Sequence, residues 1–431
     1  MKKILLMTGI AALTLSSCSQ EDVISVNDKN ADNLITFRVR SQKLSRASEF
    51  STYNLDDFMV FGFKGDADEG EELLDYFENG DPLKFTRDGL LFTSEIPYYY
   101  PGDGSWLSFA AYAPSNLKMT KADKYGGIKI DNFTVESDIT KQIDIIFADG
   151  GSNLEPDEPD QELTFKHALS KVYISEVRNS DTRFKYEIMG VKFGNIHNSG
   201  NIYYKGEKAL NMPEGEINET FNSDGYIRNG DGRIALMPTG DQNNDMEYIF
   251  NAPIILDKST TTADVMSGSD TEAVEAADKT GSFMMIPQQL SSAFLNEEGE
   301  LNSGSFDSGM SYIAFLVRIT NLITNEVIYP YAERVEAISK TIGEHTYAWA
   351  AFPVSTLWVP GLYTDYLVDF SKGAGFVAPG ADEEIVGRPI LGREIKFTIT
   401  VGEWDNGGWI TIDEKNQLGV DVADDEDPFG E

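Results

Sequence analysis

Short segments in which apolar and polar residues alternate one by one recur along this chain of 431 residues. The clearest is Ile395–Val401, where isoleucine, phenylalanine or valine holds every odd position and lysine or threonine every even one. Successive side chains of an extended strand point to opposite faces, so this pattern is typical of a strand with one buried face. Many short strands separated by turn residues predict an all-β fold made of sandwiches.

Other segments with strand-like patterns are spread over the whole chain. Two stretches have helix-like composition, Thr261–Lys279 and Ser291–Glu298, although the first also fits an acidic loop. The further predicted strands are Leu34–Arg40, Phe58–Phe63, Trp106–Tyr112, Ile128–Val135, Ile143–Phe147, Phe184–Ile188, Arg233–Met237, Tyr248–Leu256, Phe283–Ile286, Tyr312–Ile319 and Trp409–Ile412.

The N-terminus has the composition of an export signal. Lys2 and Lys3 precede the apolar run Ile4–Leu15, and small residues follow at Ser16 and Ser17. A charged start, a short apolar run and a small-residue end are typical of a signal peptide. The run is too short to span about 30 Å of hydrocarbon as a permanent helix. The alternative is a buried N-terminal helix.

Cys18 is the only cysteine, so no disulfide bond can staple the fold. The segment Leu15–Cys18 resembles a bacterial lipobox, which implies cleavage before Cys18 and acyl chains on its thiol and amino group. Several acyl chains anchor a protein stably where one does not. The acidic pair Glu21-Asp22 resembles a surface-export signal of gut and oral anaerobes. The alternative is an unmodified cysteine.

The formal charge of −36 excludes several classes of partner. Loss of Lys2 and Lys3 with the signal would make it −38, from −36 minus the two positive charges. Such a surface repels nucleic acids and anionic membranes. Because 41% of the residues are hydrophobic, the chain has enough apolar side chains for an ordered core.

Composition divides the chain into five predicted parts. The stretch Asp149–Glu162 holds six acidic residues and no basic ones, and strand-like patterns resume after it. We therefore place a domain boundary there, although it would lie some twenty residues later if Leu163–Val177 completes the first domain. The predicted parts are a signal peptide (1–17), a lipid-anchored tether (18–33), an N-terminal sandwich (34–160), a C-terminal sandwich (161–405) and a C-terminal strand segment with an acidic tail (406–431).

The sequence offers no set of residues for catalysis. Its three histidines, His167, His197 and His345, form no metal-binding motif, and cysteine ligands are absent. No nucleophile elbow, phosphate loop or dinucleotide fingerprint occurs. We therefore predict no enzyme, catalytic residue, cofactor or metal site. Weak calcium candidates are Asp66–Gly70 and Glu155–Asp160, for which solvated acidic loops are the simpler interpretation.

The densest aromatic cluster is Tyr98-Tyr99-Tyr100, followed by Pro101. Tyrosine rings in such a cluster could bind sugars. The simpler interpretation is that they pack beneath a neighbouring loop.

In order along the chain, a set of short motifs resembles the fimbrillin family, the subunits of type V pili in gut and oral anaerobes. The motifs are the first strand Leu34–Arg40 with Ser45-Arg46-Ala47 after it, Trp106–Pro114, Leu163–Val172, Met285–Gln288, Trp358–Tyr363 and Val401–Trp404. The resemblance implies two transthyretin-like β-sandwiches in tandem. It also implies a fimbrial subunit at the outer membrane whose partners are other copies or related pilus subunits.

The resemblance further implies assembly by strand exchange, in which a trypsin-like protease releases the first strand and another subunit fills its groove. Cleavage would fall between Arg46 and Ala47, and Ile35, Phe37 and Val39 would leave with the strand. An ordinary loop arginine is the alternative for Arg46. The candidate donor strand, Leu418, Val420 and Val422, has plain edge strands as its alternative.

A second hypothesis has a different function for the same lipid-anchored sandwiches. In it the chain is a surface-exposed, glycan-binding lipoprotein that does not polymerise, with Tyr98–Tyr100 as the sugar platform.

Overall fold

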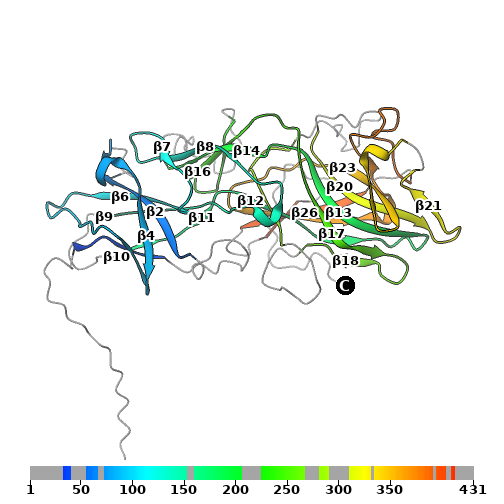
Figure 1. Cartoon of the computed structure of the whole chain (residues 1–431), viewed down its shortest axis with the longest axis horizontal. Coiled ribbons are helices and arrows are strands. Elements are labelled where there is room, and N and C mark those ends of the chain that lie inside the picture. The colour runs from blue at the N-terminus through cyan, green and yellow to red at the C-terminus, as the bar shows by residue number, and fades with distance from the viewer. Residues whose placement is uncertain are drawn as a thin grey trace, which may run out of the picture.

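The computed structural model describes residues 33–39, 55–66, 72–152, 160–205, 225–266, 281–290, 310–331, 334–391, 395–403 and 409–412. These residues form four β-sheets and a few single turns of 3₁₀ helix, so the predicted all-β sandwich fold is confirmed. A nine-stranded sheet occupies one end of the elongated molecule, and the sheets formed mainly by the later strands occupy the other (Figure 1).

The nine-stranded sheet, called here the N-terminal sheet, curls round an apolar interior. Its two end strands, β10 and β11, are separated by only two residues of chain. Its order is β10 (Asp160–Leu163), β1 (Thr36–Val39), β5 (Leu91–Ser94), β4 (Leu83–Asp88), β2 (Asp57–Lys64), β6 (Leu107–Ala113), β9 (Ile146–Ser152) and β11 (Lys166–His167), with β3 (Leu74–Asp75) paired to β2 outside this order.

Both faces of the central strands in this sheet are buried. In β2, Phe58 and Val60 point into the curl, whereas Phe61 and Phe63 belong to a second, larger core. The interior of the curl is called here the inner cluster. Its buried members are Ile35, Phe37, Leu55, Phe58, Val60, Phe77, Phe85, Phe92, Tyr100, Leu107, Phe109, Ala111, Ala113, Ile146, Ala148, Leu163 and Phe165.

A five-stranded sheet, called here the shared sheet, covers the outside of this curl with strands from both halves of the chain. The ring of Phe147 in β9 stacks on Tyr204 at 4.9 Å, and the Tyr204 hydroxyl donates to Asp149 at 2.6 Å. The order is β15 (Ile227–Arg228), β16 (Ile234–Thr239), β14 (Ser199–Tyr204), β8 (Ile128–Thr134) and β7 (Thr120–Lys121).

The remaining two sheets face each other across the larger core. The ring of Phe193 lies 5.3 Å from that of Phe283 and 6.0 Å from that of Tyr366, and the rings of Phe352 and Phe397 lie 5.3 Å apart. One sheet has β17 (Asn244–Leu256), β13 (Phe184–Ile196), β20 (Tyr312–Asn321), β23 (His345–Pro353) and β22 (Ser339–Ile342), with β21 (Glu326–Tyr329) on β20 and β25 (Phe376–Val377) on β23. The other has β18 (Thr262–Asp264), β12 (Ser170–Arg178), β24 (Leu362–Asp369), β26 (Lys396–Glu403) and β27 (Trp409–Ile412), with β19 (Phe283–Met285) on β12.

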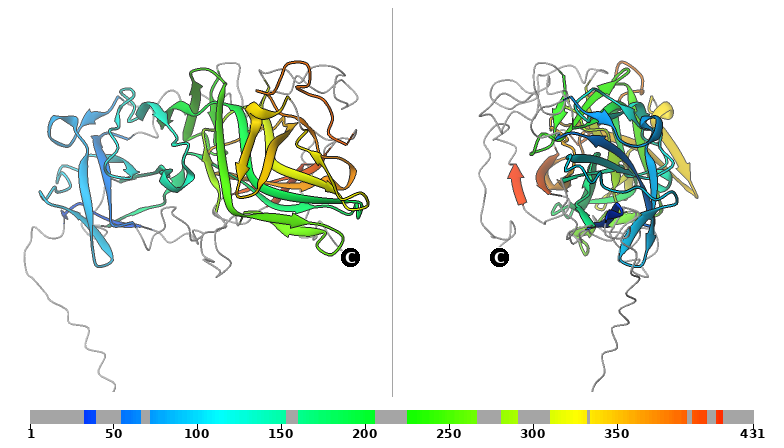
Figure 2. Two further views of the ribbon diagram at one scale, coloured as in Figure 1. Left: turned by 45° about the vertical axis from the view of Figure 1, so that its right-hand side comes forward. Right: turned by 90° about the vertical axis from the view of Figure 1, so that its left-hand side faces the viewer.

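Two long strands connect the ends of the molecule. β13 leads directly into β14, and β16 leads back into β17, so the two antiparallel pairs β13–β17 and β14–β16 follow one another (Figure 2). Strand pairing also joins residues on the two sides of the predicted domain boundary between residues 160 and 161. β8 pairs with β14, and β1 pairs with β10. The division into two sandwiches at that position, and their transthyretin-like type, remain predictions.

Short 3₁₀ turns are the only helices among the described residues: η2 (Glu78–Gly80), η3 (Ile139–Lys141), η4 (Glu336–Ile338) and η5 (Phe370–Lys372). The helical alternative for Thr261–Lys279 is wrong at its start, since Thr262–Asp264 is strand β18. Residues 267–280 and Ser291–Glu298 lie outside the described residues. Within the described part of the chain, no helix has the length and apolar character needed to cross a membrane.

Candidate functional site

The predicted removable strand lies in the N-terminal sheet between two neighbours. β1 pairs in parallel with β10 over four residue pairs, from Thr36–Asp160 to Val39–Leu163. On its other side it pairs antiparallel with β5, where Phe37 is opposite Phe92. The strand predicted at Leu34–Arg40 is thus confirmed at Thr36–Val39, but it is not an edge strand. Its loss would leave a groove with an unpaired backbone on both sides.

The inward side chains of β1 differ in how deeply they are buried. Ile35 and Phe37 are 1% and 0% exposed, whereas Val39 is half-buried at the margin of the inner cluster. The Phe37 ring meets Phe85, Phe109 and Phe58 edge-on, with centroids 4.8, 5.2 and 6.0 Å away. Edge-to-face pairs at these distances add to the gain from burial alone. Phe37 therefore occupies a site shaped by three aromatic rings, called here the Phe37 seat.

The outward side chains of β1 point away from the inner cluster. Arg38 is exposed, and its partner in the parallel register, Glu162 of β10, is exposed as well. Residues directly beside one another on adjacent strands interact, and opposite charges in that position are favourable. The polar face of β1 thus carries a charge that complements its neighbour.

The tyrosine cluster secures the start of β1 instead of forming an exposed platform. The N–H of Ile35 donates to the Tyr98 carbonyl at 2.8 Å, and the N–H of Tyr100 donates to the Asn33 carbonyl at 2.8 Å. The Tyr98 ring packs edge-on against Phe77 at 4.9 Å, and the buried Tyr100 ring packs edge-on against Phe109 at 6.3 Å. Only Tyr99 presents its ring to solvent, being 42% exposed.

The other predicted site residues lie outside the described residues. These are Cys18 with the tether, Arg46 and Ala47 between β1 and β2, and the candidate donor Leu418, Val420 and Val422. The predicted strand Trp409–Ile412 is confirmed as β27, which pairs with β26 at the end of its sheet. The predicted strands Phe58–Phe63 and Trp106–Tyr112 contain two rings of the Phe37 seat, Phe58 and Phe109, whereas the strand of Phe85 was not predicted. That the three rings meet around Phe37 was not predicted, because they come from separate strands.

The histidines do not converge on a common site. His167 and Asp144 form a buried pair, with Nδ1 2.7 Å from Oδ2. His197 lies 3.3 Å from the Thr239 carbonyl, and burial lowers its pKa. His345 is exposed at the start of β23. Among the described residues, no three histidine, cysteine or acidic side chains are grouped to hold a metal ion. This arrangement suits packing better than catalysis.

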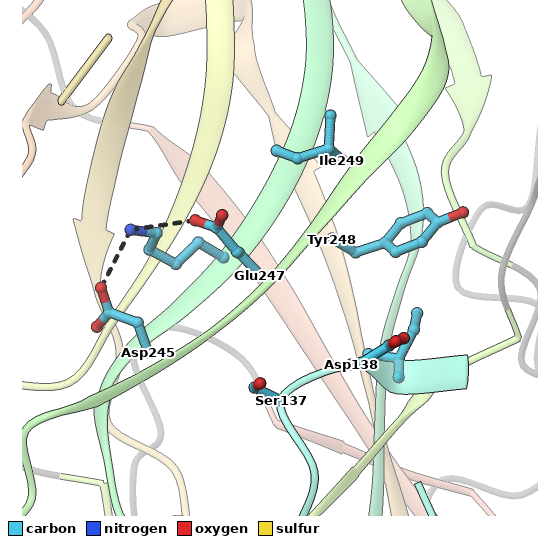
Figure 3. Close-up of a pocket in the computed structure, with 8 residues that line it drawn as sticks. Ser137, Asp138, Asp245, Glu247, Tyr248 and Ile249 are labelled. Atoms are coloured by element: carbon cyan, nitrogen blue, oxygen red, sulfur yellow. Dashed lines mark hydrogen bonds and ion pairs between the residues drawn. The ribbon is translucent and has the colours of Figure 1, made fainter. Parts of the chain in front are cut away.

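A polar cleft of about 530 Å³ lies where η3 meets β17 (Figure 3). Lys192 lies between two carboxylates there, with Nζ 3.0 Å from Asp245 and 3.5 Å from Glu247. Its ammonium also lies over the Trp349 ring, 4.8 Å from the centroid. Lys340 also pairs with Glu247, so two lysines balance the two carboxylates. The cleft therefore offers a neutralised ion cluster and not an activated acid, base or nucleophile.

Asp365 in β24 is the described carboxylate whose environment most strongly favours the neutral form. Burial raises its pKa to about 6, although the Ser175 N–H donates to Oδ1 at 3.0 Å and opposes this. An unfolded aspartate titrates near pH 3.9. The neutral carboxyl is therefore favoured by folding, and the resulting stability is complete below about pH 4 and is lost as the pH rises through about 6.

We expect Asp365→Asn to remove this pH dependence. The free energy of unfolding of the original chain should fall by about 2–3 kcal/mol between pH 4 and 7 on account of this group. The amide retains an oxygen that can accept from Ser175 but cannot ionise. Urea unfolding at several pH values measures the difference between the two proteins. The exposed Glu383→Gln is the control and should keep the pH dependence of the original chain. If the free energy of unfolding of Asp365→Asn changed with pH as it does in the original chain, Asp365 would not be the cause of the pH dependence.

Sequence and structure comparisons place the chain among related proteins. The sequence model of a family described as Fimbrillin-like matches residues 45–404, a span that begins after β1 and ends before β27. No curated protein matches the chain. A fimbrial protein from Bacteroides vulgatus ATCC 8482 is 13% identical with a TM-score of 0.47, over 86% of this chain and 99% of that one. A fimbrial assembly protein from Parabacteroides distasonis ATCC 8503 is 8% identical with a TM-score of 0.34, over 88% and 98%.

Proposed function

Because the chain belongs to the fimbrillin-like family, we propose that it is a structural and adhesive subunit of a cell-surface fimbrium. Subunits join when β1 leaves its groove and an extended segment of another subunit replaces it. The partners are other copies or related subunits, and a trypsin-like protease starts the exchange by cutting between Arg46 and Ala47.

One observation supports this proposal most directly. β1 is a strand of four residues whose inward side chains are buried in the inner cluster, and it is the first strand of the described chain. Its removal exposes an apolar floor and two unpaired strand edges, β10 and β5. Buried backbone groups without partners are costly, so the empty groove favours occupation by an extended segment that restores both ladders.

The position of β1 between two strands determines how the exchange proceeds. A cut strand held on both sides does not simply detach, because departure breaks hydrogen bonds to β10 and β5 together. We therefore expect the cut strand to remain seated until a donor displaces it from one end.

The N-terminal residues support a location at the cell surface. We propose that Cys18 carries the lipid, that residues 1–17 are the signal peptide and that the precursor is anchored in the outer membrane. These assignments rest on the order of Lys2-Lys3, the apolar run and Cys18 in the sequence. No enzymatic activity is part of the proposal.

The glycan-binding alternative has less support. Tyr98 and Tyr100 use their rings to pack against Phe77 and Phe109, which leaves Tyr99 as the exposed member of the cluster. A single half-exposed ring is a weaker sugar platform than three aligned ones.

Cleavage and assembly test the proposal. A trypsin-like protease that cuts after arginine but not after lysine should cut the folded full chain once, after Arg46. The cut protein mixed with other fimbrial subunits should form ladders that resist denaturant on a gel. Arg46→Ala should abolish both cut and ladder, since the protease needs the basic side chain. Lys43→Ala is the matched control in the same segment and should change neither. Ladders from uncut Arg46→Ala protein, or no ladder after a complete cut, would refute assembly by this route.

A further inference from the structure

The groove that β1 occupies differs along its length in which side chains it can accept. The inference drawn from this difference rests on the proposed strand exchange. The first inward position holds the fully buried Ile35, and the second holds Phe37 in its aromatic seat. The third holds Val39, only half-buried. A smaller side chain at the second position leaves a cavity, because three rings from separate strands define the site and cannot all move inward. The second position is therefore the most selective.

The outward face adds a charge preference between the second and third inward positions. Arg38 stands beside Glu162 in the parallel register of β1 and β10. An acidic residue at the position of Arg38 would place like charges side by side, which is unfavourable on adjacent strands. This contribution is smaller than that of the Phe37 seat, because both side chains are exposed.

The predicted donor segment of this chain fits neither preference. With Leu418 in place of Ile35, Val420 falls in the Phe37 seat and Asp421 falls beside Glu162. A shift by two residues puts Leu418 or Val422 into the seat, and a shift by one puts Gly419 or Asp421 there. None of these side chains is aromatic.

The aromatic residues elsewhere after β26 do not solve the problem. Trp404 directly follows β26, and with Trp404 in the Phe37 seat the place of Ile35 would fall to Gly402, which is already paired in β26. Trp409 is already part of β27, which is paired with β26. Phe429 follows Pro428, and Asp427 and Glu431 would be its inward neighbours in a strand. Burying two carboxylates in the inner cluster would be costly. Residues 404–431 therefore contain no segment that matches β1.

We propose that the β1 groove takes its replacement strand from a different polypeptide and discriminates against the tail of a second copy of this chain. The fitting strand runs parallel to β10 and has the pattern apolar, any residue, aromatic, basic, apolar. On this basis the subunit joins a mixed fimbrium and does not extend itself into a homopolymer.

Labelled peptides entering the groove of the full chain test the proposal. A site for a specific protease is introduced between β1 and β2, so that release of β1 does not depend on Arg46. The four peptides are residues 33–41, the same peptide with Phe37→Val, residues 416–424, and residues 416–424 with Val420→Phe and Asp421→Arg. Size-exclusion chromatography measures how much label travels with the cut protein.

We expect the first and fourth peptides to enter and the second and third to enter about tenfold less or weaker still. Equal entry of the unmodified 416–424 peptide and its doubly substituted form, while the 33–41 peptide also enters, would overturn the discrimination but leave strand exchange intact. Failure of all four peptides, the 33–41 peptide included, would overturn both. Uncut protein should take up none.

Discussion

Replacing Phe37 by alanine is expected to lower the free energy of unfolding of the N-terminal sheet by about 3–5 kcal/mol. The ring is 0% exposed and lies between Phe85, Phe109 and Phe58, so its loss removes buried area and leaves a cavity among rings from three strands. Urea unfolding measures the change in the free energy of unfolding, and amide hydrogen exchange in β1, β5 and β10 shows whether the loss of stability falls on these strands.

Arg38→Ala is the matched control for Phe37→Ala. It alters the same strand on its exposed face, and substitutions at such positions usually change stability by no more than about 0.5 kcal/mol. If Phe37→Ala unfolded within about 1 kcal/mol of the original chain, the three rings would have closed the gap and the seat would not be selective.

Replacing Trp358 by alanine is expected to cost a similar amount, about 3–5 kcal/mol, at the other end of the molecule. Trp358 is fully buried, its ring lies 5.8 Å from Phe193, and its Nε1–H donates to the Tyr366 hydroxyl at 3.2 Å. Alanine removes the ring and a hydrogen-bond donor together. Thermal unfolding and hydrogen exchange in β13 and β24 measure the effect.

Trp358→Phe separates the two contributions. It keeps much of the buried ring but removes the Nε1–H, and loss of one buried hydrogen bond costs about 1–3 kcal/mol. Trp358→Phe should therefore lie between the original chain and Trp358→Ala. If Trp358→Phe lost more free energy of unfolding than Trp358→Ala, burial of the ring would not be the main contribution of Trp358 to stability.

Strands with one buried face and one solvent-exposed face are predicted well from the sequence. Ile395–Val401 and residues 35–40 alternate cleanly, and both lie in strands, β26 and β1. β23 was not predicted, because its central residues are buried on both faces and Tyr347–Phe352 carries no polar alternation. A strand with two buried faces looks like any short apolar run, and period alone cannot identify it.

The groove of β1 shows what a sequence alone cannot supply. Its inward residues were predicted from alternation, but its neighbour β10 lies in a segment whose acidic composition suggested a linker. The parallel pairing of Thr36–Val39 with Asp160–Leu163 joins segments far apart in the chain, and no local pattern encodes such a contact. The seat's aromatic rings also come from separate strands, so their convergence appears only in the folded chain.

The shared sheet has a consequence for how the chain emerges during synthesis and export. The outer side of the N-terminal sheet, with Phe147 among its apolar residues, is covered by β14 and β16 from after residue 198. Until that later segment has folded onto them, the earlier strands expose an apolar surface. Exposed apolar surface of this kind binds chaperones or leads to aggregation. Maturation of the first half must therefore wait for the second, and a fragment ending at residue 160 is expected to be poorly soluble.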